Sequence, residues 1–207
     1  MVLKYRHFVN LHKLTTPFVI LALMQYYDNY TVGPAIYFGI HTGYCICWLL
    51  KDLFIHPDHS LEEEVTHAQF VVLFMVLNTY WLIPYVLISS KVVPSITTIM
   101  VSIPICLLGF YMVFGADGQR FFTLKCRPGL ITTGFFTRTR NPNYFGETVL
   151  YLGWSLLAES AIPLLVVFAM ALGVFYPRMV KKDVSLARHE EFAKYKAESN
   201  FFFPKLF

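Results

Sequence analysis

Long apolar runs separated by short polar stretches dominate this chain. The runs that could form membrane helices cover residues 14–27, 33–50, 68–90, 93–115, 145–158 and 162–177. A helix needs roughly 20 apolar residues to cross the hydrocarbon core of a bilayer. The first run and the last two are shorter, so we expect them to tilt, to cross only part of the bilayer or to be lengthened by flanking residues. The pattern predicts one all-α membrane domain over residues 1–207, a polytopic bundle of about six spans with a C-terminal surface helix.

Composition and charge support a lipid environment. Hydrophobic residues make up 56% of the 207 residues and charged residues only 14%, which is more apolar surface than one soluble core can hide. With an even number of spans, every Lys and Arg except Lys91 falls on the side that also holds both termini. The positive-inside rule makes this the cytosolic or matrix side, in the endoplasmic reticulum or the mitochondrial inner membrane. The net charge of +4 therefore reflects topology, and no nucleic-acid partner is expected.

A histidine-rich stretch precedes the third apolar run. On a helix, His59, Glu63 and His67 would share one face, as ligands of a metal ion could. Short polar stretches before membrane helices collect such residues readily, and residues 58–64 also have the acidic character of a helix start. We therefore predict no metal site.

The most informative stretch is TRTRNPNYFGE, residues 137–147. It ends in Glu147, a carboxylate at the start of an apolar run, where an ionisable side chain is costly and suggests a function. Helical spacing places Asn143, Glu147, Tyr151 and Trp154 on one face, and Gly146 and Gly153 on another stripe. Glycines at such positions let a neighbouring helix approach closely. Glu147 could instead form a purely structural salt bridge to a nearby arginine and anchor the helix start.

Basic residues flank this stretch on both sides. A predicted loop before it holds Arg120, Lys125, Arg127, Arg138 and Arg140 with one acid, Asp117. A predicted helix over residues 183–198 returns further charged residues to the same side. We expect the loop, the start of the fifth span and this tail helix to meet and to enclose a polar pocket at the membrane surface. Simple contact with anionic lipid headgroups would also explain the loop, and a solvated surface helix would explain the tail.

Residues 109–207 resemble the C-terminal half of the steroid 5-alpha reductase superfamily, and are most similar to its small steroid-reductase-like members. The resemblance rests on R-N-P-N-Y-F-G-E at 140–147, K-D at 182–183, F-x-x-Y at 192–195 and a closing F-P. Residues 1–108 show no comparable match. The superfamily also takes in sterol reductases and, more distantly, isoprenylcysteine and phospholipid methyltransferases.

The resemblance implies a pocket for NADPH. Its residues would be Asp117, Arg127, Arg140, Asn143, Tyr144, Glu147, Asp183, Arg188 and Tyr195. Asn143 and Glu147 would hold the nicotinamide amide, which needs both a donor and an acceptor, and the arginines would bind phosphates. In the methyltransferases the corresponding pocket holds S-adenosylmethionine, and their motif typically reads R-H-P-x-Y. Asn141 stands where that histidine would be, which favours the reductases.

The implied activity is hydride transfer to an activated carbon–carbon double bond of a hydrophobic small molecule, a sterol or polyprenyl enone. The resemblance places the substrate-side acid in the early helices, where the candidates are Tyr26, Tyr44, Asp52, Tyr80 and Tyr85. Two alternatives stay open. One is a methyltransferase acting on a lipid or a prenylated cysteine. The other is a non-catalytic subunit of a larger membrane complex, for example a mitochondrial respiratory complex. Its apolar ending FFFPKLF would then dock on a partner.

Overall fold

The computed structural model describes residues 2–57 and 61–205, and these residues form helices and connections without any strand. The all-α prediction is confirmed, since 76% of the structure is helical. The chain divides into two compact units. Unit 1 comprises Met1–Ser102 and Trp154–Val166, and unit 2 comprises Ile103–Gly153 and Val167–Phe207.

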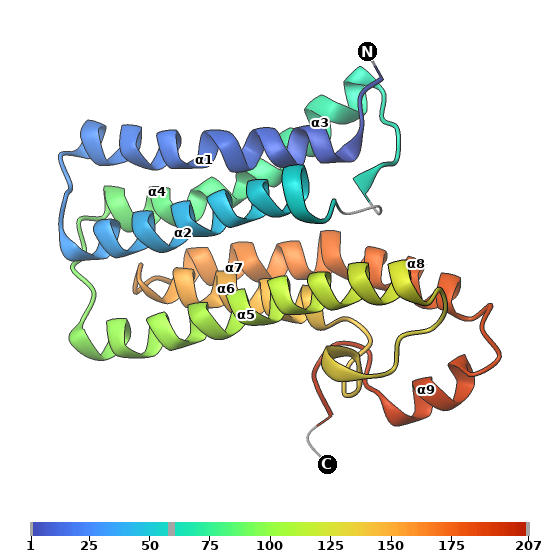
Figure 1. The fold of residues 1–207 in the computed structure, drawn as a ribbon. Helices are drawn as coiled ribbons and strands as arrows, with labels where there is room; N and C mark the ends of the chain where they lie inside the picture. The colour runs from blue at the N-terminus through green and yellow to red at the C-terminus, as the bar shows by residue number, and fades with distance from the viewer. Residues whose placement is uncertain (1, 58–60, 206–207) are drawn as a thin grey trace. The chain divides into compact units, whose positions relative to one another are not determined.

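Unit 1 is built on a long first helix that packs along three others, α2, α3 and α4 (Figure 1). Asp28, in a left-handed conformation with φ 47°, ends the first helix by donating its N–H to the carbonyls of Gln25 and Met24. Thr66 and Gln69 start the third helix with a reciprocal capping box. The elements are α1 (Tyr5–Tyr27), α2 (Val32–Leu50), the π-helical turn η1 (Lys51–Ile55), α3 (His67–Asn78), η3 (Thr79–Trp81) and α4 (Leu82–Ser89).

Unit 2 contains most of α5 and α6 and the whole C-terminal part of the chain. The start of α5, the end of α6 and residues 161–166 of α7 belong to unit 1. The elements that lie wholly or partly in unit 2 are α5 (Ile96–Cys126), η4 (Gly134–Phe136), α6 (Pro142–Leu156), α7 (Ala161–Met170), the π-helical turn η5 (Ala171–Phe175), α8 (Tyr176–Leu186) and α9 (Phe192–Glu198). Figure 1 shows α8 leading through a short connection into α9.

Glycines bring α5 and α6 into close contact. A Cβ atom on Gly109 would lie 2.4 Å from the backbone nitrogen of Leu150, and one on Gly146 would lie 2.8 Å from the Cβ of Met112. Neither helix could keep its place with a larger residue at these positions. The predicted role of Gly146 in a close helix contact is thus confirmed.

In the described part of the chain, three helical segments are long and apolar enough to cross a membrane. They are His67–Ser89, Ile96–Cys126 and Ala161–Leu186. They correspond to the third, fourth and last of the predicted spans, and they make the chain compatible with an integral membrane protein. The helices of the other three predicted spans, α1, α2 and α6, fall outside this set, so the total of about six spans stays a prediction.

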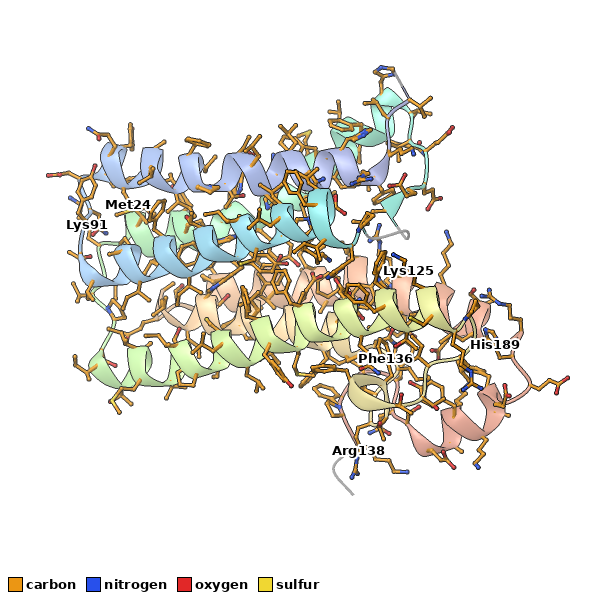
Figure 2. All side chains as sticks on the ribbon, viewed as in Figure 1. Met24, Lys91, Lys125, Phe136, Arg138 and His189 are labelled. Carbon is orange, nitrogen blue, oxygen red and sulfur yellow. The ribbon has the colours of Figure 1, made fainter. Side chains whose placement is uncertain are left out.

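Some predicted boundaries were wrong. The fourth span does not end near residue 115 but continues to Cys126, so Arg120 and Lys125 lie on α5 instead of in a loop. Lys125 occupies the last turn of that helix, and Lys91 lies in the connection before it begins (Figure 2). The single tail helix over residues 183–198 is interrupted, because α8 ends at Leu186 and α9 starts at Phe192. The interruption lets α9 bury Phe192 and Tyr195 within unit 2.

Candidate functional site

The residues predicted to hold a cofactor all belong to unit 2. They come from α5, from the segment around the start of α6, and from α8, α9 and their connection. Asp117 is on α5 and Arg127 directly follows it. Arg140 precedes α6, which carries Asn143, Tyr144 and Glu147; Asp183 is on α8, Arg188 follows that helix, and Tyr195 is on α9.

Arg140 is the centre of an ionic clamp. Its Nε lies 3.1 and 3.0 Å from the two carboxylate oxygens of Asp183, and its Nη2 lies 3.0 Å from Oδ2. Nη1 donates to the carbonyl of Ser199 at 2.6 Å. Only 4% of Arg140 is exposed. A planar guanidinium favours such paired geometry, and here it joins α8 and the tail to the residues before α6.

Backbone hydrogen bonds close the same junction. Arg140 N–H donates to the carbonyl of Asn200 at 2.9 Å, and Asn200 N–H donates to the carbonyl of Arg138 at 3.2 Å. The side chains of Thr139 and Asn141 add hydrogen bonds of 2.8 Å to tail carbonyls. The segment before α6 and the C-terminal segment therefore meet, as predicted.

Tyr195 secures this junction from α9. Its hydroxyl donates to the carbonyl of Phe136 at 2.7 Å, and both side chains are buried. Burial raises the pKa of Tyr195 to about 12, so the phenol stays protonated at neutral pH. Tyr195 therefore acts as a hydrogen-bonding support for the loop that precedes α6. Arg138, in the same loop, is instead exposed and points outward in Figure 2.

Two asparagines at the start of α6 have unsatisfied amide oxygens. The Oδ1 atoms of Asn141 and Asn143 are buried and have no hydrogen-bond partner among the described residues. Asn143 is 9% exposed, and Glu147 lies one helical turn further on the same face. The neighbouring Tyr144 packs its ring 5.2 Å from that of Phe175. Because a buried polar atom without a partner is costly, the Asn143 oxygen suits a donor from a bound molecule.

The other charged residues of the predicted set differ in exposure. Asp117 is buried, with its carboxylate 3.7 Å from the guanidinium of Arg120. Arg127 and Arg188 are exposed, and Arg188 donates to the hydroxyl of Ser185 at 2.7 Å. Of the three arginines in the predicted cofactor set, Arg127 and Arg188 are therefore exposed, whereas the charge of Arg140 is matched by Asp183.

Unit 1 contains buried polar residues that the sequence analysis did not connect. At one end, Asp52 accepts hydrogen bonds from Arg6 at 3.0 Å and from Asn10 at 2.7 Å, and only 1% of it is exposed. Asn10 in turn accepts from the indole of Trp48 at 3.2 Å. Arg6 and Asn10 lie on α1, Trp48 on α2 and Asp52 on η1, so these hydrogen bonds join the three elements.

Further along the same two helices, Lys13 and His41 are buried. The Lys13 ammonium lies 4.5 Å from the ring centre of Tyr44, a cation–π distance. His41 bonds through Nδ1 to the hydroxyl of Tyr37 at 3.0 Å and stacks at 4.0 Å on Trp154, so it is a hydrogen-bonded core residue. Its Nε2 is buried without a partner among the described residues. We call this set of residues the polar seam: Arg6, Asn10, Lys13, Tyr37, His41, Tyr44, Trp48 and Asp52.

Helical spacing could have revealed the polar seam. Positions 6, 10 and 13 share one face of α1, and positions 37, 41, 44 and 48 share one face of α2. Of the proposed substrate-side acids, Tyr44 and Asp52 belong to this seam and Tyr80 is buried elsewhere in unit 1. Tyr26 and Tyr85 are 81% and 44% exposed.

The histidine-rich stretch gives no metal centre in the part of the chain that is described. His59 and the start of the 58–64 segment lie outside the described residues. Among residues 2–57 and 61–205, no three His, Cys, Asp or Glu side chains gather as metal ligands would.

An all-α fold with helices long and apolar enough to cross a membrane is compatible with the class of helical integral membrane proteins. A family model described as "Protein of unknown function (DUF1295)" matches residues 55–202. The match covers well over half of the chain, so the protein belongs to this family, which is steroid 5-alpha reductase-like. It also reaches into the region before residue 109, where the sequence alone gave no match. Neither the curated proteins nor the solved structures yielded a match.

Proposed function

We propose that this protein is an integral membrane reductase that binds NADPH in unit 2 and reduces the activated double bond of a lipid-like enone, such as a sterol or polyprenyl compound. The observation that carries the proposal is the buried, unpartnered Oδ1 of Asn143. A nicotinamide carboxamide offers the N–H donor that this oxygen lacks. Glu147, one turn along α6, offers a second acceptor for the same group.

We assign different tasks to the arginines. Arg140 spends its hydrogen bonds on Asp183 and Ser199 and so fixes the tail beside the start of α6. The exposed Arg127 and Arg188 would bind the phosphates of the dinucleotide. When bound, NADPH supplies the hydride. The protein's part is to orient the nicotinamide through Asn143 and to hold the surrounding loop closed through Tyr195.

Calorimetric titration of the detergent-purified protein tests the proposal. NADPH should bind saturably, and Asn143→Leu should weaken binding by about tenfold or more, because it removes the acceptor. Asn143→Asp keeps an acceptor oxygen and should retain most of the affinity. Without ligand, Asn143→Leu should unfold at the same temperature as the wild type or higher, since it removes a buried unsatisfied oxygen.

The alternatives give different results in the same titration. Binding of S-adenosylmethionine without NADPH would support a methyltransferase of lipids or prenylated cysteines. Equal NADPH binding by the wild type and Asn143→Leu would contradict the role given to Asn143. Binding of neither molecule by a folded sample would leave a non-catalytic subunit of a membrane complex. One observation favours that second candidate: Arg140, the most buried arginine of the motif, holds the fold together.

The membrane and the orientation belong to the proposal as well. The basic residues that follow α5 and α8 support a cytosolic or matrix position for both termini, in the endoplasmic reticulum or the mitochondrial inner membrane.

A further inference from the structure

A pocket of about 500 Å³ lies beside α8 and α9 in unit 2. Its size falls within the usual range for small-molecule sites. Asn143, Tyr144 and Glu147 are not among its lining residues, so it differs from the proposed nicotinamide position. Its lining consists of Arg140, Tyr176, Val180, Asp183, Val184, Ala187, Phe192, Lys196 and Phe201.

One wall of the pocket is an apolar face of α8. Tyr176, Val180 and Val184 follow one another at intervals of four residues and therefore share that face. They are 52%, 39% and 72% exposed. The helix that carries them ends the candidate span Ala161–Leu186. A wall that is both apolar and exposed at the end of a membrane helix is in position to contact an acyl chain.

The charged residues of the lining add up to a net positive charge. Arg140 and Asp183 balance each other in their ion pair, which leaves the exposed Lys196 of α9 as the uncompensated charge of the lining. Phe201 lies close to both the apolar face and the ion pair. Its ring lies 5.8 Å from that of Tyr176, and the guanidinium carbon of Arg140 lies 5.7 Å from its centre.

We propose that this pocket binds an anionic phospholipid, with an acyl chain against α8 and the phosphate beside Lys196. Basic pockets next to membrane helices on the cytosolic or matrix side recognise anionic headgroups, and each basic residue near the surface contributes about 1 kcal/mol. The pocket combines the two required features, an apolar wall that continues a membrane helix and a net positive rim. The lipid joins α8, α9 and Phe201 in unit 2. Asn143, to which the proposed function assigns the nicotinamide, does not line this pocket.

Native mass spectrometry of the detergent-purified protein tests this site. The probes are phosphatidylglycerol and phosphatidylcholine with identical acyl chains, and inorganic phosphate as a competitor. We expect one phosphatidylglycerol to bind in preference to phosphatidylcholine. Lys196→Gln should weaken phosphatidylglycerol binding about fivefold. Lys194→Gln, on the same helix but outside the pocket, is the matched control and should change it little.

A second pair of variants tests the apolar wall. Val180→Trp should fill the pocket and abolish specific binding of the lipid. Phe168→Trp alters an exposed side chain on α7 that does not line the pocket, so it should leave binding unchanged. Equal binding of both lipids, equal effects of the two lysine variants, or displacement of the lipid by phosphate alone would overturn the proposal. None of these readouts depends on NADPH, so they are independent of the proposed reductase activity.

Discussion

The two units bury their charged residues in different ways. Unit 2 places Arg140 and Asp183 at the ends of helices, where the guanidinium meets a carboxylate and a backbone carbonyl. Unit 1 places Lys13 on α1 and Asp52 on η1, the continuation of α2, along packed helix faces and among aromatic rings and amides. The charge at the start of α6 belongs to the compact motif at residues 137–147, which can be recognised from the sequence. Helical spacing can group the charges on the face of one helix, but only the fold shows which face of another helix they meet.

The contrast also concerns what each arrangement does. The clamp in unit 2 joins segments that are distant in sequence, since Arg140 contacts α8 and the tail. The polar seam in unit 1 joins neighbouring helices, and it leaves His41 Nε2 buried without a partner in the described chain. In unit 2 the polar groups stabilise a junction, whereas in unit 1 they specify how two helices face each other.

Breaking the clamp should have the largest effect. Arg140→Leu leaves the Asp183 carboxylate beside the tail without its cation, and losing one partner of a buried ion pair costs about 3–5 kcal/mol of unfolding free energy. The control is Arg138→Leu, at an exposed position whose guanidinium makes one hydrogen bond to the carbonyl of Lys205. Thermal unfolding in detergent measures both. Similar melting temperatures for the two variants would show that the ion pair does not stabilise unit 2.

Breaking the outer end of the polar seam should have a smaller effect. Asp52→Ala removes the acceptor shared by Arg6 and Asn10, and hydrogen bonds to a charged group are worth about 1.5–3 kcal/mol. The loss stays below that of Arg140→Leu because Arg6 keeps its ion pair with Glu62 at 2.7 Å. A double-mutant cycle of Asp52→Ala with Asn10→Ala measures the coupling by chemical denaturation. Additive losses would mean that the seam consists of independent contacts.

The fold class and the meeting of the two basic segments could be predicted from the sequence. Long apolar runs predict helices directly. Gly146 predicted a close helix contact because a glycine within a membrane helix lets a neighbouring backbone approach. The choice of partner could not be predicted. Arg140 binds a carboxylate or a phosphate with the same geometry, and only the fold shows that Asp183 occupies it.

Some helix boundaries also depended on packing. The first apolar run begins at residue 14, yet α1 starts at Tyr5. The first turns of α1 contain too many polar residues to continue the apolar run. They join the helix because Asp52 and Glu62 accept hydrogen bonds from its Arg6. The interruption between α8 and α9 has the same kind of cause, since Tyr195 must reach the carbonyl of Phe136.

The smallest predicted effect concerns Glu159, a carboxylate of unit 1 that lies at a turn and outside both the clamp and the polar seam. It has a left-handed φ of 45° between α6 and α7 and accepts hydrogen bonds from Thr98 Oγ1 at 2.6 Å and from Ser95 N–H at 2.9 Å. The hydrogen bond from Thr98, followed by that from Ser95, lowers the pKa of this carboxyl below 4.5. It thereby fastens the start of α5.

A carboxyl with a lowered pKa stabilises the fold above its ordinary pKa, and this contribution is lost as the pH falls through the folded-state value. The melting temperature of the wild type should therefore exceed that of Glu159→Gln at pH 6, and the difference should shrink below about pH 4.5. Glu190→Gln, at an exposed position between α8 and α9, is the control and should follow the wild type at every pH. A difference that persists unchanged to pH 3 would show that Glu159 holds α5 by its shape and not by its charge.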